Sequence, residues 1–172
     1  IDIHHAILPR TSRLRPDPSR LLAAARPLPD PRLQVLAPTD MVLHSLLHLF
    51  HEGDPAEGLR LRDLVDVSDL IAHFGREPGF WDSLVPRAHE LDLQRPLYYG
   101  LRFVRSILGA DVPEAVARDV ERGAPAAPVR WLMDRLVPLA ILPEHPDFPR
   151  RSAALARWLM YMRSHWLRMP PM

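Results

Sequence analysis

The sequence contains no cysteine, no lysine and no asparagine, and only 7 of its 172 residues are glycine. Without cysteine the chain can form neither a disulfide nor a thiolate metal site, and this composition suits a reducing cytoplasm. All 22 basic residues are arginine, which we attribute to a genome that favours arginine, alanine and proline. The formal net charge is +1, so no general attraction to nucleic acid or to an acidic membrane is expected.

Long apolar runs are missing as well. Charged residues interrupt every stretch that approaches the ~20 apolar residues of a membrane span, and the N-terminus lacks the basic start and long apolar stretch of a signal peptide. A chain of 172 residues has the size of one domain, which buries roughly 70% of its unfolded surface. We therefore expect a cytoplasmic protein with one hydrophobic core.

The sequence opens with a single strand pattern. Residues 1–9, IDIHHAILP, alternate with the two-residue period of a strand, which places Asp2 and His4 on the same face. Helical patterns dominate the rest of the chain, so this strand is expected to find at most a short partner, near residues 34–36. The predicted fold class is mainly α: a multi-helix bundle with one N-terminal strand.

Proline and glycine divide the remaining sequence. Residues 10–37 are rich in proline and arginine and predict an extended, wrapping segment, with room for a helix only at residues 19–26. Residues 38–172 predict a helical domain, in which the first two helices pair as a hairpin at the centre of the bundle. The expected helices of this domain span residues 38–52, 59–74, 81–91, 96–108, 113–122, 129–142 and 150–168.

Three histidines form a stripe on the first of these helices. At 100° per residue, His44, His48 and His51 fall within about 60° of one another, outside the main apolar face. Such a stripe has three interpretations: surface side chains that face solvent or pair with carboxylates, a zinc site, or a buried hydrogen bond between His48 and Asp66 of the next helix. The stretch HSLLH lacks the glutamate of an H-E-x-x-H metalloprotease helix. We expect no zinc site in the isolated chain.

The last helix carries apolar and arginine residues at helical spacing. The apolar set predicts a core face, and the arginines predict a solvated face. A basic amphipathic helix with tryptophan is also known from membrane surfaces and RNA-binding proteins, which leaves a second interpretation open. The predicted core residues are Leu155, Trp158, Leu159, Met162 and Trp166, and the predicted solvated residues are Arg151, Arg157, Arg163 and Arg168.

The order of three segments, IDIHH, then HSLLHLFH, then LRLRDLVDVSDLI, resembles the C-terminal part of a bacterial family of uncharacterised nucleotidyltransferase-like proteins over about the first seventy residues. In that superfamily a small sheet carries a Gly-Ser turn, a D-x-D pair and a third carboxylate, with metal-bound nucleotide among them. The resemblance implies that Asp2 is this third carboxylate, as a catalytic residue or metal ligand. It implies substrate contacts by His4, His48, Arg62 and Asp66, with Mg²⁺ as cofactor and a nucleoside triphosphate and an unknown acceptor as partners.

The chain departs from the family pattern in one respect. No Gly-Ser turn or D-x-D pair precedes the strand, and Asp63, Asp66 and Asp69 follow one another at helical spacing instead. We therefore expect the C-terminal, helical part of a nucleotidyltransferase-like protein, which transfers a nucleotidyl group when an N-terminal half is present and is inactive alone. The alternatives are a non-catalytic helical interaction module, in which Asp2 is only a solvated carboxylate, and a histidine-ligated metal-binding bundle.

Overall fold

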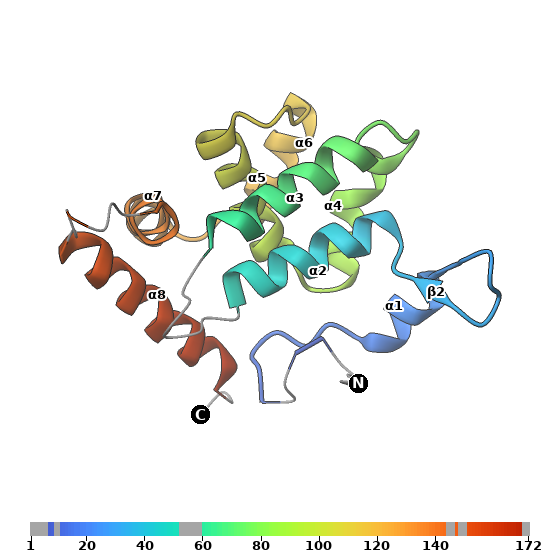
Figure 1. Cartoon of the computed structure of the whole chain (residues 1–172), viewed down its shortest axis with the longest axis horizontal. Helices are drawn as coiled ribbons and strands as arrows, with labels where there is room; N and C mark the ends of the chain where they lie inside the picture. Colours follow the sequence, from blue (N-terminus) through green and yellow to red (C-terminus); the bar gives the residue numbers. More distant parts are fainter. Residues whose placement is uncertain (1–6, 9–10, 52–59, 144–146, 148–150, 170–172) are drawn as a thin grey trace.

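A computed structural model of the protein describes residues 7–8, 11–51, 60–143, 147 and 151–169. These residues form a bundle of helices with one small antiparallel sheet, so the predicted mainly α fold class is confirmed (Figure 1). Most of the strand predicted over residues 1–9 lies outside the described residues. Within it, Leu8 is buried against the helical core and Ile7 packs beside it.

The N-terminal segment holds more regular structure than its prolines predict. Helix α1 (Pro18–Ala24) begins behind Asp17, whose carboxylate accepts a hydrogen bond from the Ser19 backbone N–H at 2.9 Å. Strands β1 (Arg26–Pro27) and β2 (Gln34–Val35) then pair antiparallel. Residues 34–36 were predicted to pair with the N-terminal strand, but residues 34–35 pair with β1 instead. The short loop between β1 and β2 closes at a small entropic cost, which favours this local pairing.

The helices of the bundle are confirmed, with ends that differ from the predictions by at most two residues. The exception is the helix predicted at residues 113–122, which divides into α6 and the 3₁₀ helix η1. The observed elements are α2 (Pro38–His51), α3 (Leu61–Phe74), α4 (Phe80–Glu90), α5 (Gln94–Leu108), α6 (Glu114–Asp119), η1 (Val120–Gly123), α7 (Ala127–Ile141) and α8 (Arg151–Arg168).

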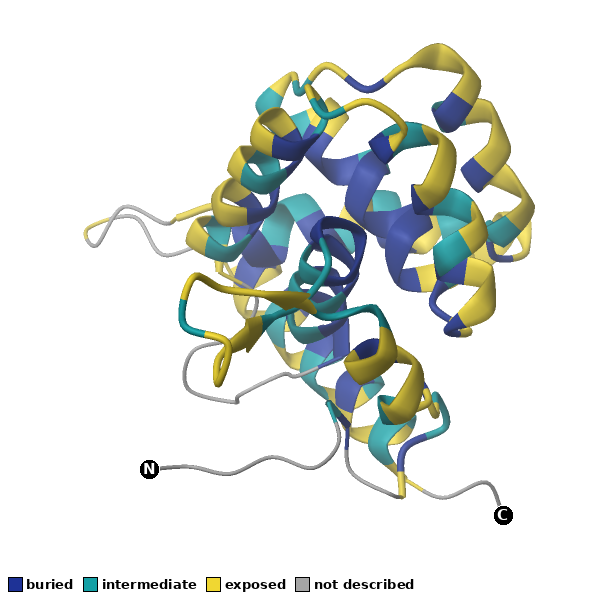
Figure 2. Ribbon diagram, turned by 90° about the vertical axis from the view of Figure 1, so that its right-hand side faces the viewer, coloured by how far each residue is buried: buried dark blue, intermediate teal, exposed yellow. Residues whose placement is uncertain are grey.

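Helices α2, α3 and α5 form the centre of the bundle, where the buried residues gather (Figure 2). The predicted pairing of α2 with α3 is present, and Leu46 and Leu64 are both fully buried. The sequence analysis did not place α5 at the centre. Gly100 of α5 lies against the Leu46 side chain so closely that a Cβ atom there would overlap it. The two helices therefore approach each other at a position that only glycine permits.

A buried ion pair joins the N-terminal end of α2 to α4. Asp40 is fully buried and accepts two hydrogen bonds from the Arg87 guanidinium, at 2.7 and 2.8 Å. Arg87 also donates to the Glu90 carboxylate at 2.7 Å and to the backbone carbonyl of Arg20 at 2.9 Å. These carboxylates raise the pKa of the Arg87 guanidinium. One side chain thus holds α1, α2 and α4 together.

Helix α8 is turned the opposite way from the prediction. Its buried residues are small or flexible: Ala153, Ala156, Met160 and Ser164. The residues predicted as its core are largely exposed, with Leu155, Trp158 and Trp166 each showing at least 55% of their surface, Met162 also exposed and Leu159 half-buried. Alanines let the α8 backbone approach its neighbours closely, and the hydrophobic pattern alone does not reveal this. Among the arginines predicted to be solvated, only Arg151 is exposed. Arg157 and Arg168 are half-buried, and Arg163 reaches inward, where burial lowers its pKa.

Candidate functional site

Three of the residues predicted to contact substrate, His48, Arg62 and Asp66, lie on the two helices of the α2–α3 hairpin. Asp2 and His4 lie outside the described residues. The end of α2, which carries His48, and the start of α3, which carries Arg62 and Asp66, lie at the same end of the hairpin (Figure 1). His48 is half-buried, whereas Arg62 and Asp66 are exposed. No hydrogen bond joins Asp66 to His48, so that interpretation of the histidine stripe is not supported.

His44 and His48 form a close pair on α2. Their Nε2 atoms lie 3.0 Å apart, and their rings meet edge to face with centroids 4.3 Å apart. At this distance one imidazole donates the proton and the other accepts it, so the pair can hold or pass one proton at Nε2. Within the described ranges, no group of three or more His, Cys, Asp or Glu side chains could hold a metal ion.

His51 does not belong to an exposed stripe, and the prediction is wrong at this residue. It is buried, with 2% of its surface exposed, and its Nε2 atom lies 2.8 Å from the Ser12 hydroxyl. The helical angle places it near His44 and His48, but the N-terminal segment and α8 cover it. This tertiary cover has no signal in the local sequence.

The carboxyl end of α2 is capped by α8. The last carbonyls of a helix have no partner within the helix and need one elsewhere. Here the Phe50 carbonyl accepts a hydrogen bond from the Arg163 guanidinium, and the His51 carbonyl accepts one from the Ser164 hydroxyl, both at 2.8 Å. The backbone N–H of Arg13 donates to the Leu167 carbonyl at 2.9 Å. Ser12 and Arg13 are therefore held beside the end of α2 and beside α8.

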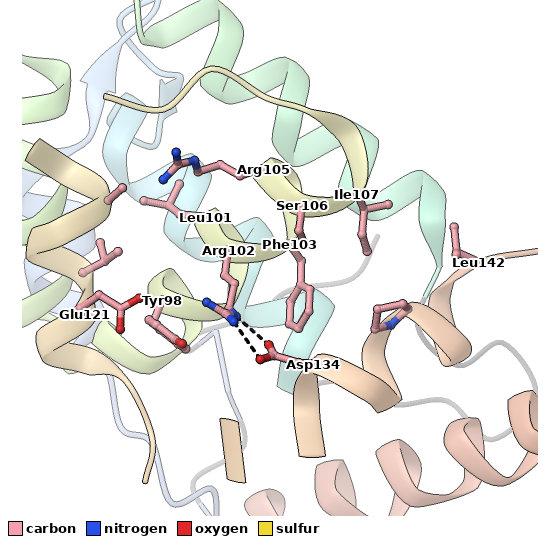
Figure 3. A pocket seen from close by; sticks show the side chains of 13 residues that line it. Tyr98, Leu101, Arg102, Phe103, Arg105, Ser106, Ile107, Glu121, Asp134 and Leu142 are labelled. Atoms are coloured by element: carbon pink, nitrogen blue, oxygen red, sulfur yellow. Dashed lines mark hydrogen bonds and ion pairs between the residues drawn. The ribbon is translucent and has the colours of Figure 1, made fainter. Parts of the chain in front are cut away.

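A pocket of about 850 Å³ opens between α5, η1 and α7 (Figure 3). Inside it, the Arg102 guanidinium donates two hydrogen bonds to the Asp134 carboxylate, at 2.6 and 2.8 Å. The Tyr98 hydroxyl is buried and makes no hydrogen bond to any described residue, and burial raises the pKa of this phenol. No predicted site residue lines the pocket. The sequence patterns do not indicate this pocket, because it forms only where α5, η1 and α7 meet in the folded bundle.

Comparison with known proteins gives one match. Residues 1–109 match a family described as uncharacterised nucleotidyltransferase. The chain belongs to this family. No curated protein and no solved structure matches the chain. The family segment runs from the IDIHH motif to Gly109, the residue that ends α5, so every predicted site residue lies inside it. Helices α6, α7 and α8 lie beyond it.

The magnesium ion implied by the resemblance does not fit the described residues. Mg²⁺ is held by oxygen ligands, usually one or two carboxylates together with phosphate and water. The carboxylates of Asp66 and Asp69 are exposed on α3, and Asp63 faces Arg60 at 3.2 Å. Asp2, the carboxylate assigned to the metal, lies outside the described residues. We therefore derive no step through a metal ion from this chain.

Proposed function

We propose that this chain is the helical, acceptor-side part of a nucleotidyltransferase. The observation that carries the proposal is the family match over residues 1–109, which includes the IDIHH motif and the central helices α2, α3 and α5. The reaction needs carboxylates that the described residues do not bring together, so we assign them to a Gly-Ser and D-x-D segment outside this sequence. The donor is a nucleoside triphosphate, and the acceptor is a hydroxyl or amine of unknown identity.

We assign Asp2 the role of the third carboxylate. In the proposed step the acceptor oxygen attacks the α-phosphorus of the nucleoside triphosphate, pyrophosphate leaves, and the proton of the acceptor hydroxyl passes to the Asp2 carboxylate. Asp2 belongs to the IDIHH motif at the start of the family segment. Among the described residues that follow, Leu8 is buried, Ser12 is hydrogen-bonded to His51 of α2, and the Arg13 backbone N–H donates to the Leu167 carbonyl of α8. These contacts attach the chain to the helices shortly after Asp2.

We propose that Arg62 and His48 contact the phosphates or the acceptor from the helical side. Arg62 is exposed and forms no ion pair with any described residue, so its planar guanidinium is available to phosphate oxygens. The half-buried His48 lies at the same end of the hairpin and shares a proton with His44. Arg62→Ala should weaken binding of the nucleotide about tenfold. Arg76→Ala, which removes another exposed arginine of the family segment, serves as the matched control.

The decisive experiment uses the protein with its upstream segment and follows transfer of an α-³²P label from each of the four nucleoside triphosphates to acceptors in a cell extract. Asp2→Asn should lower the transfer rate by at least ~100-fold, the low end of what one acid–base group contributes, and leave the melting temperature unchanged. Asp69→Asn, on the exposed side of α3, should leave the rate unchanged. The 172-residue chain alone should transfer nothing. Two results would contradict the proposal: an Asp2→Asn variant that transfers nucleotide at the wild-type rate, or any transfer by the 172-residue chain alone. Either result would favour the alternative of a non-catalytic interaction module.

A further inference from the structure

The exposed large apolar residues of the described chain are concentrated on α7 and α8. On α8 they are Leu155, Trp158, Met162 and Trp166, each at least 43% exposed. Their spacing of three, four and four residues keeps them within about 80° on the helix and spreads them over about 16 Å. We call these four residues the α8 stripe. On α7, Val129, Trp131 and Leu132 are exposed as well.

The α8 stripe faces away from the body of the protein. The opposite face of the helix, with Ala153, Ala156 and Met160, is the one that packs against the rest of the bundle. Scattered exposed apolar residues are normal, but a continuous row with two tryptophans marks a surface that contacts another molecule. Tryptophan also prefers surroundings that are apolar on one side and wet on the other.

The charged residues of α8 itself have one sign. Residues 151–168 include four arginines and one histidine and no aspartate or glutamate. Arg151 is exposed at the start of the helix, and the guanidinium of Arg13 stacks on the Trp166 ring, 4.0 Å from its centroid. On α7 the exposed Arg135 stacks on Trp131 at 3.8 Å. A second copy of the chain would place like charges face to face on this surface, which costs several kcal/mol in other interfaces. The charge pattern therefore favours an anionic partner.

We propose that the α8 stripe binds the surface of membranes that contain anionic lipids, with α8 lying in the plane of the interface. Leucine, methionine and the tryptophan rings would enter the boundary between headgroups and acyl chains, and the exposed Arg151 would contact lipid phosphates. A bilayer surface accepts an irregular row of Trp, Leu and Met along one helix without a matching groove. No helix among the described residues is long and apolar enough to cross the membrane, so the contact is peripheral.

The test mixes the 172-residue chain, without nucleotide, with vesicles of phosphatidylcholine alone or with 30% phosphatidylglycerol. Sedimentation and the blue shift of tryptophan emission measure binding. We expect binding to the anionic vesicles at least ~10-fold tighter than to neutral ones, and weakening in 0.5 M NaCl. Trp158→Ala combined with Trp166→Ala should weaken it at least ~10-fold. Leu22→Ala, which removes an exposed leucine of α1, should not. Melting temperatures verify that the variants are folded.

Four results would overturn the proposal. The first is equal binding to neutral and anionic vesicles, or none to either. The second is a folded Trp158→Ala, Trp166→Ala variant that binds as the parent does. The third is a dimer in solution that the double tryptophan variant abolishes, which would mean that a second copy of the chain covers the α8 stripe. The fourth is tight binding of single-stranded RNA that competes with the vesicles. Arg151→Glu provides a second check, since it should weaken binding to anionic vesicles while both tryptophans remain.

Discussion

The family segment and the helices beyond it bury their apolar residues by different rules. In α2 and α3, large side chains such as Leu43, Leu47 and Leu64 are fully buried. The polar residues on the other side of α3 are exposed: Arg62, Asp66, Asp69 and His73. In α8 the small residues are buried and the large ones are outside. The family segment follows the hydrophobic pattern because its helices have one apolar face each. Helix α8 has two apolar faces, so its pattern does not determine which one packs.

The two regions also differ in how polar groups join the helices. In the family segment, Asp40 and Arg87 form a buried pair of side chains. In α8, the side chains of Arg163 and Ser164 instead donate hydrogen bonds to backbone carbonyls of α2. Removal of one partner of the buried pair leaves the other charge buried and unpaired, which should destabilise the fold. Substitutions at exposed positions of α8 should change the stability little. The five predictions below test this contrast, from the largest expected effect to the smallest.

Asp40→Ala should lower the free energy of unfolding by about 3–5 kcal/mol, because it leaves the Arg87 guanidinium largely buried and without its main partner. Urea titration followed by circular dichroism measures the loss. Glu114→Ala removes the partner of Arg105 in an ion pair whose glutamate is 75% exposed, and it should cost less than about 1 kcal/mol. A similar loss in both variants would show that the buried pair is not special.

Leu46→Ala and Leu64→Ala should each cost about 2–5 kcal/mol, since both side chains are fully buried and a cavity replaces them. The same titration applies, with Leu33→Ala in the exposed loop between β1 and β2 as the control. A loss below about 1 kcal/mol at Leu46 or Leu64 would mean that the faces of α2 or α3 are assigned wrongly.

Gly100→Ala should destabilise the protein by about 1–3 kcal/mol, because the added methyl group overlaps the Leu46 side chain. In a Leu46→Ala background the space is free, so the same substitution should cost much less. A double-mutant cycle measures this coupling. If the two effects simply add, α5 does not approach α2 at this point.

Leu155→Ala and Trp158→Ala should change the free energy of unfolding by no more than about 0.5 kcal/mol, since both side chains are more than half exposed. Ala156→Leu, on the buried face of the same helix, should cost about 1–3 kcal/mol through overpacking. The reverse ranking would restore the original prediction that the large apolar residues of α8 form its core.

The chain purified without a histidine tag should contain no stoichiometric zinc. His44 and His48 supply two nitrogens, His51 is turned into the core, and the described residues offer no group that completes a four-ligand site. Elemental analysis measures the metal content. Zinc at one equivalent that disappears in His48→Ala would promote the metal-binding alternative.

Proline and glycine made the helix boundaries predictable. Pro38 starts α2, and Gly109, with a φ of 68°, ends α5 in a conformation that side chains rarely adopt. The surroundings of His51 and the inward turn of Arg163 were not predictable, because each depends on contacts between segments that lie far apart in the sequence. The pocket beside Tyr98 was not predicted either, because helix periodicity does not show how α5, η1 and α7 meet.

The candidate site was predicted only in outline. The family assignment is confirmed, and the hairpin brings the positions of His48, Arg62 and Asp66 to one end of the bundle. The roles of these residues and of Asp2 stay predictions. A short motif such as IDIHH identifies the family, but the catalytic geometry depends on carboxylates from another part of the protein, and no local pattern in this chain specifies where they lie.

The cap that α8 places on α2 has a consequence for the order in which the protein is made. The ribosome completes α2 long before it reaches Arg163 and Ser164, more than a hundred residues later. Until then the carbonyls of Phe50 and His51 lack these two partners and must bond to water instead. The carboxyl end of α2 is therefore capped only after α8 has emerged. A chain interrupted before α8 should expose this end of α2 to chaperones and proteases.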